Sequence, residues 1–204
     1  LHRHSQLPYD IINLTGNNNH LIIQAGGNAG LYPKIYAEHF KIVMTFEPDY
    51  KNFFCLSHNV SDQNVFKFQT CLGDKFDFLD VEYNPKFKEG DNRGAMRVTD
   101  QKVRQIPQIT IDSLNVEPDV IHLDIEGYEY FALKGAEKTI LKSNPLIILE
   151  TNGSGDIYNC PQDKIDRYLE SLGYNILEKL KADTDYAKIK KRFYYNWKIQ
   201  ISAR

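Results

Sequence analysis

The chain has 204 residues, of which 42% are hydrophobic and 25% are charged, and its formal net charge is −2. This balance is typical of one globular domain, and it excludes a general electrostatic attraction to nucleic acid or to an acidic membrane surface. No apolar run approaches the ~20 residues that span a bilayer, and residues 1–9 lack the apolar core of a signal peptide. The three cysteines are scattered, so we expect a reducing, cytoplasmic location.

The first half of the chain alternates short apolar runs with helical patterns, after an N-terminal extension at residues 1–19. Strands are predicted at residues 21–23, 42–46 and 65–70. Asp49 is a suitable N-cap for the helix that follows the second strand. We expect the buried face of that helix at Tyr50, Phe53 and Phe54. The polar segment 74–105 is rich in Gly, Asn and Asp, and we interpret it as an insertion that forms a hairpin or a mobile loop.

The second half continues this alternation and indicates the fold class. Strands are predicted at residues 120–124, 146–149, 174–180 and 193–201, and helices at 132–141 and 161–172. Because strands alternate with helices, we expect right-handed βαβ units and a mostly parallel sheet, which the last two strands close in antiparallel fashion. The predicted fold is an α/β, Rossmann-like single domain over residues 1–204, with its core at 20–202.

A glycine-rich turn follows the first predicted strand, and it contains Gly26, Gly27, Asn28 and Gly30. Glycines let the backbone turn sharply and approach a ligand closely, and the next helix presents free N–H groups there. Asn28 and Leu31 break the dinucleotide-binding pattern, and no phosphate-binding lysine follows. The alternative interpretation is a tight strand–helix turn without a ligand.

An acidic residue, Glu47, ends the second predicted strand. A carboxylate at this place can accept hydrogen bonds from both hydroxyls of a ribose. Alternatively, Glu47 stabilises the start of the next helix through the helix dipole. Together, the glycine turn and the acid indicate an adenosine-containing ligand that needs no pyrophosphate.

Several motifs resemble the FkbM-type methyltransferase family. The stretch VIHLDIEGYE at 120–129, LKGA at 133–136 and PLIILE at 145–150 are similar to its central motifs. QAGGNAGLY at 24–32, FEP at 46–48, LGD at 72–74 and ITIDSL at 109–114 are similar to its other motifs. The resemblance covers roughly residues 20–150. It implies a class I methyltransferase fold, S-adenosylmethionine as the methyl donor, and usually an oxygen on a sugar, lipid or natural product as the acceptor.

The resemblance also implies residue roles. Gly26, Asn28 and Gly30 would line the methionine part of the donor, Glu47 would hold the ribose, and Leu72 and Gly73 would lie near the adenine. The predicted donor-binding residues are Gln24, Gly26, Gly27, Asn28, Gly30, Glu47, Pro48, Leu72, Gly73 and Asp124. Two positions depart from the family pattern: Gln24 replaces the usual Asp, which removes a charge attraction to the donor's ammonium, and His122 replaces the usual Lys.

Carboxylates after the fourth and fifth strands of the predicted parallel sheet are the catalytic candidates: Asp124, Glu126 and Glu150. Methyl transfer needs two positioned reactants and removal of a proton from the acceptor, and clustered carboxylates could supply the base. Asp124, Glu150 and Asn152 could instead hold Mg²⁺ or Ca²⁺. A third interpretation is that Glu126 and Glu129 cap the next helix.

The acceptor side is less defined by the sequence. The loop at 84–97, with Lys86, Lys88, Arg93 and Arg97, is either a lid or a solvated insertion, and the aromatic run 193–197 is either an acceptor wall or part of the sheet. We expect a small-molecule or glycan acceptor and a monomer or homodimer. Two other functions remain open: a degenerate cofactor-binding domain without catalysis, suggested by Gln24, and a nicotinamide-dependent oxidoreductase on a similar sheet.

Overall fold

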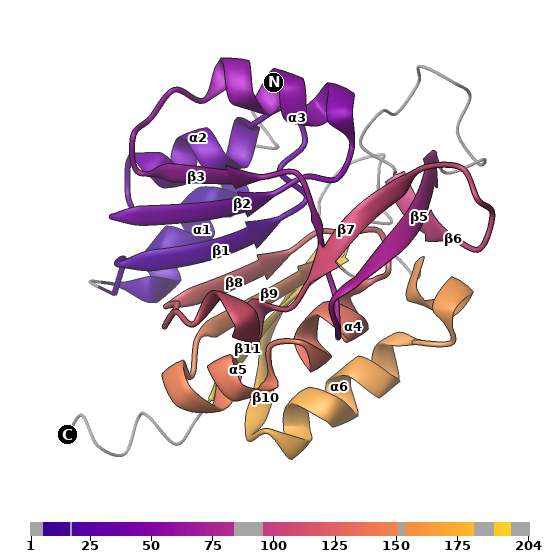
Figure 1. Cartoon of the computed structure of the whole chain (residues 1–204). Helices are drawn as coiled ribbons and strands as arrows, with labels where there is room; N and C mark the ends of the chain where they lie inside the picture. The colour runs from indigo at the N-terminus through magenta and orange to yellow at the C-terminus, as the bar shows by residue number, and fades with distance from the viewer. Residues whose placement is uncertain (1–5, 17, 84–95, 151–153, 182–189, 197–204) are drawn as a thin grey trace.

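The computed structural model describes residues 6–16, 18–83, 96–150, 154–181 and 190–196, the last two strands largely by their backbone. A seven-stranded sheet forms the centre, in the order β10-β11-β9-β8-β1-β2-β3 (Figure 1). Its strands are β1 (Leu21–Ala25), β2 (Ile42–Phe46), β3 (Val65–Phe68), β8 (Val120–Leu123), β9 (Leu146–Glu150), β10 (Tyr174–Lys181) and β11 (Lys190–Asn196). The strands from β3 to β9 pair in parallel, whereas β11 is antiparallel to both neighbours. The predicted α/β fold with a C-terminal antiparallel strand is therefore confirmed.

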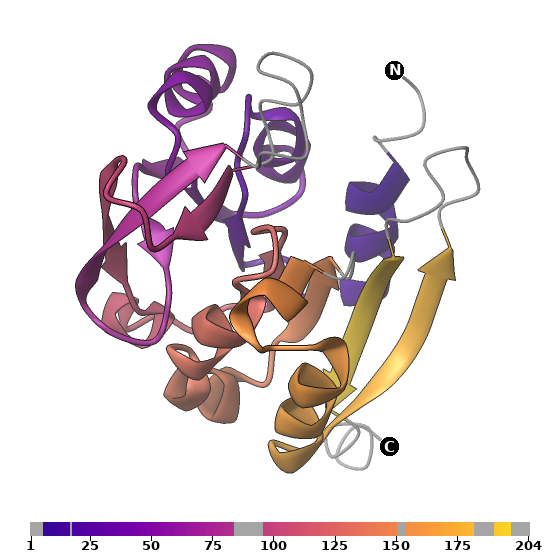
Figure 2. The same cartoon turned by 90° about the vertical axis from the view of Figure 1, so that its right-hand side faces the viewer.

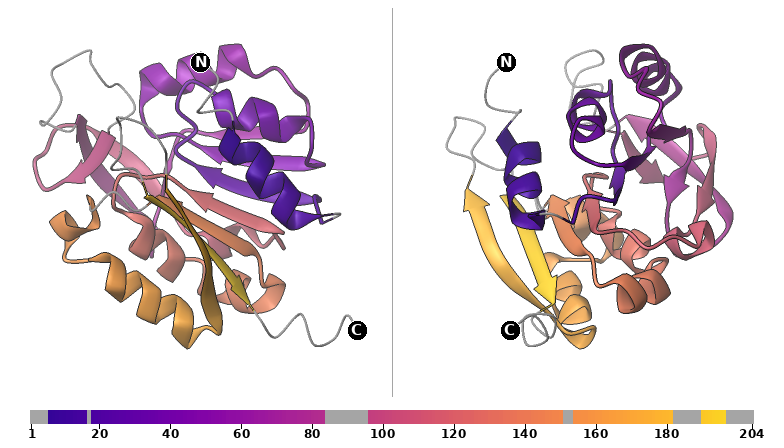
Figure 3. Two further views of the ribbon diagram at one scale, coloured as in Figure 1. Left: turned by 180° about the vertical axis from the view of Figure 1, so that it is seen from behind. Right: turned by 90° about the vertical axis from the view of Figure 1, so that its left-hand side faces the viewer.

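Helices cover both faces of this sheet. They are α1 (Gln6–Thr15), α2 (Leu31–Ala37), α3 (Tyr50–Asn59), α4 (Glu129–Lys134), α5 (Glu137–Ser143) and α6 (Gln162–Ser171). Because side chains alternate along a strand, Ile22 of β1 joins the core under α1, α2 and α3, whereas Ile23 joins the core under α4, α5 and α6. Figure 3 shows α1 and α2 in front of the sheet when the molecule is seen from behind. None of the described helices is long and apolar enough to cross a bilayer.

The helices differ from the sequence expectations at three places. The helix predicted at 132–141 is divided into α4 and α5, which are separated at residues 135–136. Helix α1 lies inside the segment interpreted only as an extension, and its Ile11 is fully buried in the core beside Ile22. In α3 the expected buried face is correct at Phe53, which packs against the core, but wrong at Tyr50 and Phe54, which are 49% and 74% exposed, while Asn52 and Leu56 are buried. The helical period explains this difference: positions 52 and 56 share one face, and position 54 projects from nearly the opposite side.

A second sheet, in the order β4-β7-β5-β6, stands beside the main one (Figure 2). Its strands are β4 (Cys71–Leu72), β5 (Asp77–Tyr83), β6 (Met96–Thr99) and β7 (Gln105–Ile109). β5 and β6 pair antiparallel, as in the hairpin interpretation of segment 74–105, and β5 also pairs with β7. A small core of Cys71, Val81, Met96 and Ile106 holds this sheet together.

Candidate functional site

A tight glycine bend joins β1 to α2. Gly26 and Gly27 both donate their backbone N–H groups to the carbonyl oxygen of Phe46, at 3.0 Å each. Gly26 has a φ of +86°, and a Cβ added there would lie 2.0 Å from the backbone oxygen of Asp124. Glycine is therefore required because the ends of β1 and β8 approach each other too closely for any side chain.

Glu47 lies against this bend. Its Oε2 accepts a hydrogen bond from the Asn28 N–H at 2.7 Å, and its Oε1 accepts one from the Asp49 N–H at 2.9 Å. Burial raises the pKa of Glu47 to about 7, although the two N–H bonds act in the opposite direction. The helix-capping role is filled by Asp49, whose side chain accepts from the N–H groups of Lys51 and Asn52. Glu47 also contacts the start of α3, through the Asp49 N–H and the Asn52 side chain, so its interpretation as a helix-start carboxylate stays an alternative.

The bend and Glu47 line one cleft of about 550 Å³ that opens to solvent. It lies at the carboxyl ends of β1 and β8, where the strand order reverses and open α/β sheets commonly bind ligands. The predicted residues that line it are Gly26, Glu47, Pro48, Leu72, Asp124 and Glu126. The fold thus brings four separate chain segments to one crevice.

Other predicted donor residues are not among the described residues that line the cleft, and they support it from outside. Asn28 contributes the backbone N–H that Glu47 accepts. Gly30 precedes α2, and a Cβ there would lie 2.6 Å from a methyl group of Val60. Gly73 packs against Gly135, where an added Cβ would lie 1.9 Å from the Gly73 oxygen. The LGD and LKGA motifs therefore meet in space, which their separation in the sequence does not reveal.

The two departures from the family pattern lie side by side in the sheet. Gln24 pairs with His122 across β1 and β8, and both side chains are fully buried. The Gln24 amide donates to the carbonyl oxygens of Ala25 and Gly26, and its oxygen accepts from the Thr45 hydroxyl at 2.5 Å. His122 Nδ1 lies 3.0 Å from the Tyr36 hydroxyl. Both residues are thus built into the core beneath the cleft, on the α2 side of the sheet.

The catalytic candidates occupy different places. Asp124 and Glu126 line the cleft, whereas Glu150 is buried at the end of β9 and is not among the described lining residues. Asn152 lies outside the described residues. Within the described part of the chain, no group of three or more His, Cys, Asp or Glu side chains is placed to hold a metal ion.

Glu129 holds the bend that presents these carboxylates. It begins α4, and its Oε1 accepts from the N–H groups of Ile125 and Gly127 at 3.1 and 3.3 Å. Between them, Glu126 has a φ of +55°, a left-handed conformation that is uncommon for residues other than glycine. Full burial raises the pKa of Glu129 to about 7. The helix-start interpretation therefore describes Glu129, while Glu126 faces the cleft.

The second sheet supplies a wall that the sequence motifs do not reveal. Arg97 lines the cleft, and its Nε and Nη2 donate to Glu82 Oε1 at 3.0 and 2.7 Å. The Tyr128 ring also lines the cleft, and it packs edge-on against Tyr158, whose hydroxyl donates to the Val98 oxygen at 3.0 Å. The sequence prediction that reaches this wall is Arg97, which was included in the possible lid at 84–97. The other cations of the predicted lid, Lys86, Lys88 and Arg93, lie outside the described residues.

Comparison with known proteins agrees with this geometry. Residues 24–176 match the methyltransferase FkbM domain. A solved FkbM methyltransferase from Methylobacillus flagellatus is similar with a TM-score of 0.61 and 19% identity, over 87% of this chain and 44% of that chain, so this chain spans less than half of that protein. The magnesium protoporphyrin IX methyltransferase of Synechocystis with bound S-adenosylmethionine is similar with a TM-score of 0.56 and 10% identity, over 95% of this chain and 79% of that chain.

The ribosomal protein L11 methylase of Lactobacillus delbrueckii is similar with a TM-score of 0.55 and 10% identity, over 96% of this chain and 79% of that chain. At such low identities these structures show a common fold only. No curated protein sequence matches the chain. The domain match, which extends over more than half of the sequence, and the shared fold show that this chain belongs to the FkbM family of methyltransferases and has the class I methyltransferase fold.

Proposed function

We propose that the chain transfers a methyl group from S-adenosylmethionine to a hydroxyl oxygen of a small-molecule or glycan acceptor. One observation carries this proposal: Glu47 contacts the glycine bend, and both line a single cleft with Leu72 and Asp124. An adenosyl ligand needs a carboxylate for its ribose and close backbone approach for its other end, and both lie in this crevice. The free state of all three cysteines supports a reducing, cytoplasmic location as part of the proposal.

The residues present fit the donor. Glu47 accepts one backbone N–H bond on each carboxylate oxygen and a further hydrogen bond from the Asn52 side chain, so a ribose hydroxyl would donate to a remaining lone pair. Pro48 and Leu72 offer apolar surface for the adenine. The Gln24 amide is engaged within the core and carries no charge, so Glu47, Asp124 and Glu126 are the carboxylates that bring negative charge to the cleft. That charge favours a cationic donor.

When bound, the donor supplies a methyl group on a sulfonium, which is a good leaving group. The chain then has to orient the acceptor hydroxyl and accept its proton. Asp124 is the first candidate for this base, because it ends β8 inside the cleft, and Glu126 is the second. A divalent ion at Asp124, Glu150 and Asn152 stays a prediction, which activity after exhaustive chelation would test.

Calorimetry with S-adenosylmethionine, S-adenosylhomocysteine and NAD tests the proposal. We expect the first two to bind and NAD to give no heat. Glu47→Ala should weaken S-adenosylhomocysteine binding at least ~tenfold, since a charged hydrogen-bonding group contributes about 1.5–3 kcal/mol. Glu38→Ala, an exposed change beside α2, is the matched control and should bind as the parent does.

Three outcomes contradict the proposal in different ways. Binding of NAD alone would favour the oxidoreductase alternative. Unchanged donor affinity in Glu47→Ala would remove the ribose assignment. Tight donor binding without turnover over a broad panel of hydroxyl acceptors would favour a cofactor-binding domain without catalysis, as the Gln24 substitution suggests.

A further inference from the structure

A fully buried carboxylate, Asp49, joins the donor side of the cleft to the second sheet. Its Oδ1 accepts from the N–H groups of Lys51 and Asn52 at the start of α3, at 3.0 and 2.9 Å. Its Oδ2 accepts from the Tyr83 hydroxyl at 3.1 Å and from Arg104 Nη1 at 2.8 Å. Tyr83 ends β5, and Arg104 precedes β7. One side chain therefore connects three segments that are distant in the sequence.

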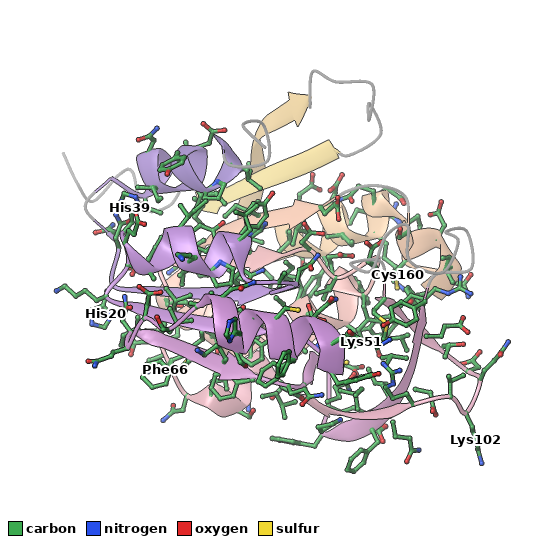
Figure 4. The ribbon with its side chains drawn as sticks, turned by 90° about the horizontal axis from the view of Figure 1, so that it is seen from above. His20, His39, Lys51, Phe66, Lys102 and Cys160 are labelled. Atoms are coloured by element: carbon green, nitrogen blue, oxygen red, sulfur yellow. The ribbon has the colours of Figure 1, made fainter. Side chains whose placement is uncertain are left out.

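The backbone of Asp49 is hydrogen-bonded to the ribose-binding candidate. The Asp49 N–H donates to Glu47 Oε1 at 2.9 Å, so the position of the Asp49 backbone fixes one oxygen of Glu47. Arg104 contacts the same turn twice, because its guanidinium also lies over the Tyr50 ring at 4.8 Å. Figure 4 shows Lys51, two residues after Asp49, at the end of α3 that faces the second sheet.

The connection also reaches the wall that the second sheet supplies. Val81 on β5 and Met96 on β6 line the same cleft as Glu47, and both strands belong to the sheet that Tyr83 and Arg104 tie to Asp49. The relative placement of the two walls thus depends on this contact.

We propose that Arg104 is a positioning residue for donor binding: through Asp49 it fixes the loop that presents Glu47 and holds the second sheet against it. The inference rests on the proposed function, because it takes Glu47 as the ribose ligand. Asp49 has no solvent exposure, and its other partners are neutral, so Arg104 is the described cation that compensates its charge. A buried carboxylate without such a partner is costly, and its loop will move toward water.

Loss of the Arg104 charge should also change the pKa of Glu47, which loss of a merely structural contact would not do. The groups facing Glu47 are Asp49 on its own loop, Asn52 of α3 and the Cys71 thiol of β4. Burial first, and the charge of Asp49 to a smaller extent, raise the pKa of Glu47 to about 7. Without Arg104 the Asp49 charge acts on Glu47 uncompensated, and the pKa of Glu47 rises further. Donor binding needs ionised Glu47. In a variant without Arg104, the pH at which donor affinity is half of its maximum should therefore move upward.

The test is S-adenosylhomocysteine affinity measured by calorimetry from pH 6 to 9. We expect Arg104→Met to weaken binding at pH 7 by roughly tenfold, less than a fully buried pair would give, because the Arg104 side chain is 33% exposed. The pH midpoint should rise, and Arg104→Lys should restore most of both properties. Lys102→Met is the matched control, since it removes the same charge from an exposed position in the same turn.

Parent-like affinity and an unchanged midpoint in Arg104→Met would overturn the inference while leaving the proposed function intact. Failure of the parent chain to bind either S-adenosyl compound would instead overturn the proposed function. If Arg104→Met does not fold, Asp49→Asn decides, because it keeps a capping oxygen but removes the charge. Its pH midpoint should fall, and a midpoint equal to that of the parent would overturn the coupling.

Discussion

Alanine substitutions at two glycines can distinguish the cost of an unfavourable backbone conformation from the cost of a steric clash at the cleft. Gly16 and Gly26 both have left-handed backbones, with φ of +60° and +86°. Alanine in a left-handed backbone conformation destabilises the protein by ~1–2 kcal/mol at either site. At Gly16 a Cβ meets nothing within 4 Å, whereas at Gly26 it would lie 2.0 Å from the Asp124 oxygen, so the two strand ends must separate by about 1 Å. Such overpacking adds ~1–3 kcal/mol.

We therefore expect Gly26→Ala to destabilise the protein by about 2–5 kcal/mol and Gly16→Ala by ~1–2 kcal/mol, measured by urea unfolding. Because the displaced strand ends line the cleft, Gly26→Ala should also lose most affinity for S-adenosylhomocysteine, and Gly16→Ala should keep it. Equal losses of stability together with equal affinities in the two variants would refute the argument that close approach of β1 and β8 shapes the donor site.

Two further predictions concern carboxylates. Asp124→Asn should keep S-adenosylhomocysteine binding while lowering methyl transfer ~10²–10⁴-fold, as expected for loss of a general base; full activity would remove Asp124 from catalysis. The pKa of Glu129 is raised from an ordinary 4.5 to about 7 by burial, so between these pH values the folded state holds a proton that the unfolded state releases. Stability relative to Glu129→Gln should therefore fall as pH rises from 4.5 to 7, by on the order of 3 kcal/mol, and urea unfolding that shows a pH-independent difference would contradict this.

The main sheet could be predicted from the sequence because its signals are local. Strands such as Leu146–Glu150 are continuous apolar runs, as expected for parallel strands covered on both faces. The second sheet gives no such signal: β4 has two residues, β5 is mostly exposed or half-buried, and β7 contains Pro107. Its strands are stabilised by pairing with distant segments, which local periodicity does not encode. Helix α1 gives only a short signal of this kind, in which Leu7, Ile11 and Ile12 pack against the core.

The donor side of the site was accessible to sequence reasoning for the same reason. The glycine bend and Glu47 each follow a recognisable strand, so their approach follows from the topology alone. By contrast, Arg104 meets Asp49 across 55 positions, and Tyr158 meets Val98 across 60. Neither pair belongs to a motif, and neither has a local signal that predicts its partner.

The glycines of the motifs have two different roles in the structure: some line the cleft, and others allow two backbone segments to make contact. Gly135 and Gly127 have no space for a side chain. A Cβ at Gly135 would lie 1.9 Å from the Gly73 oxygen, and a Cβ at Gly127 would lie 2.4 Å from the Ser154 carbonyl carbon. These are contacts between backbones, so they constrain the residue type without touching a ligand. These glycines of the motifs therefore lie at junctions of the fold, where two backbones meet. The wall formed by β5, β6 and Tyr128 lines the cleft with side chains instead, including those of Val81, Met96 and Arg97, so we expect substitutions there to alter the choice of acceptor under the proposed function.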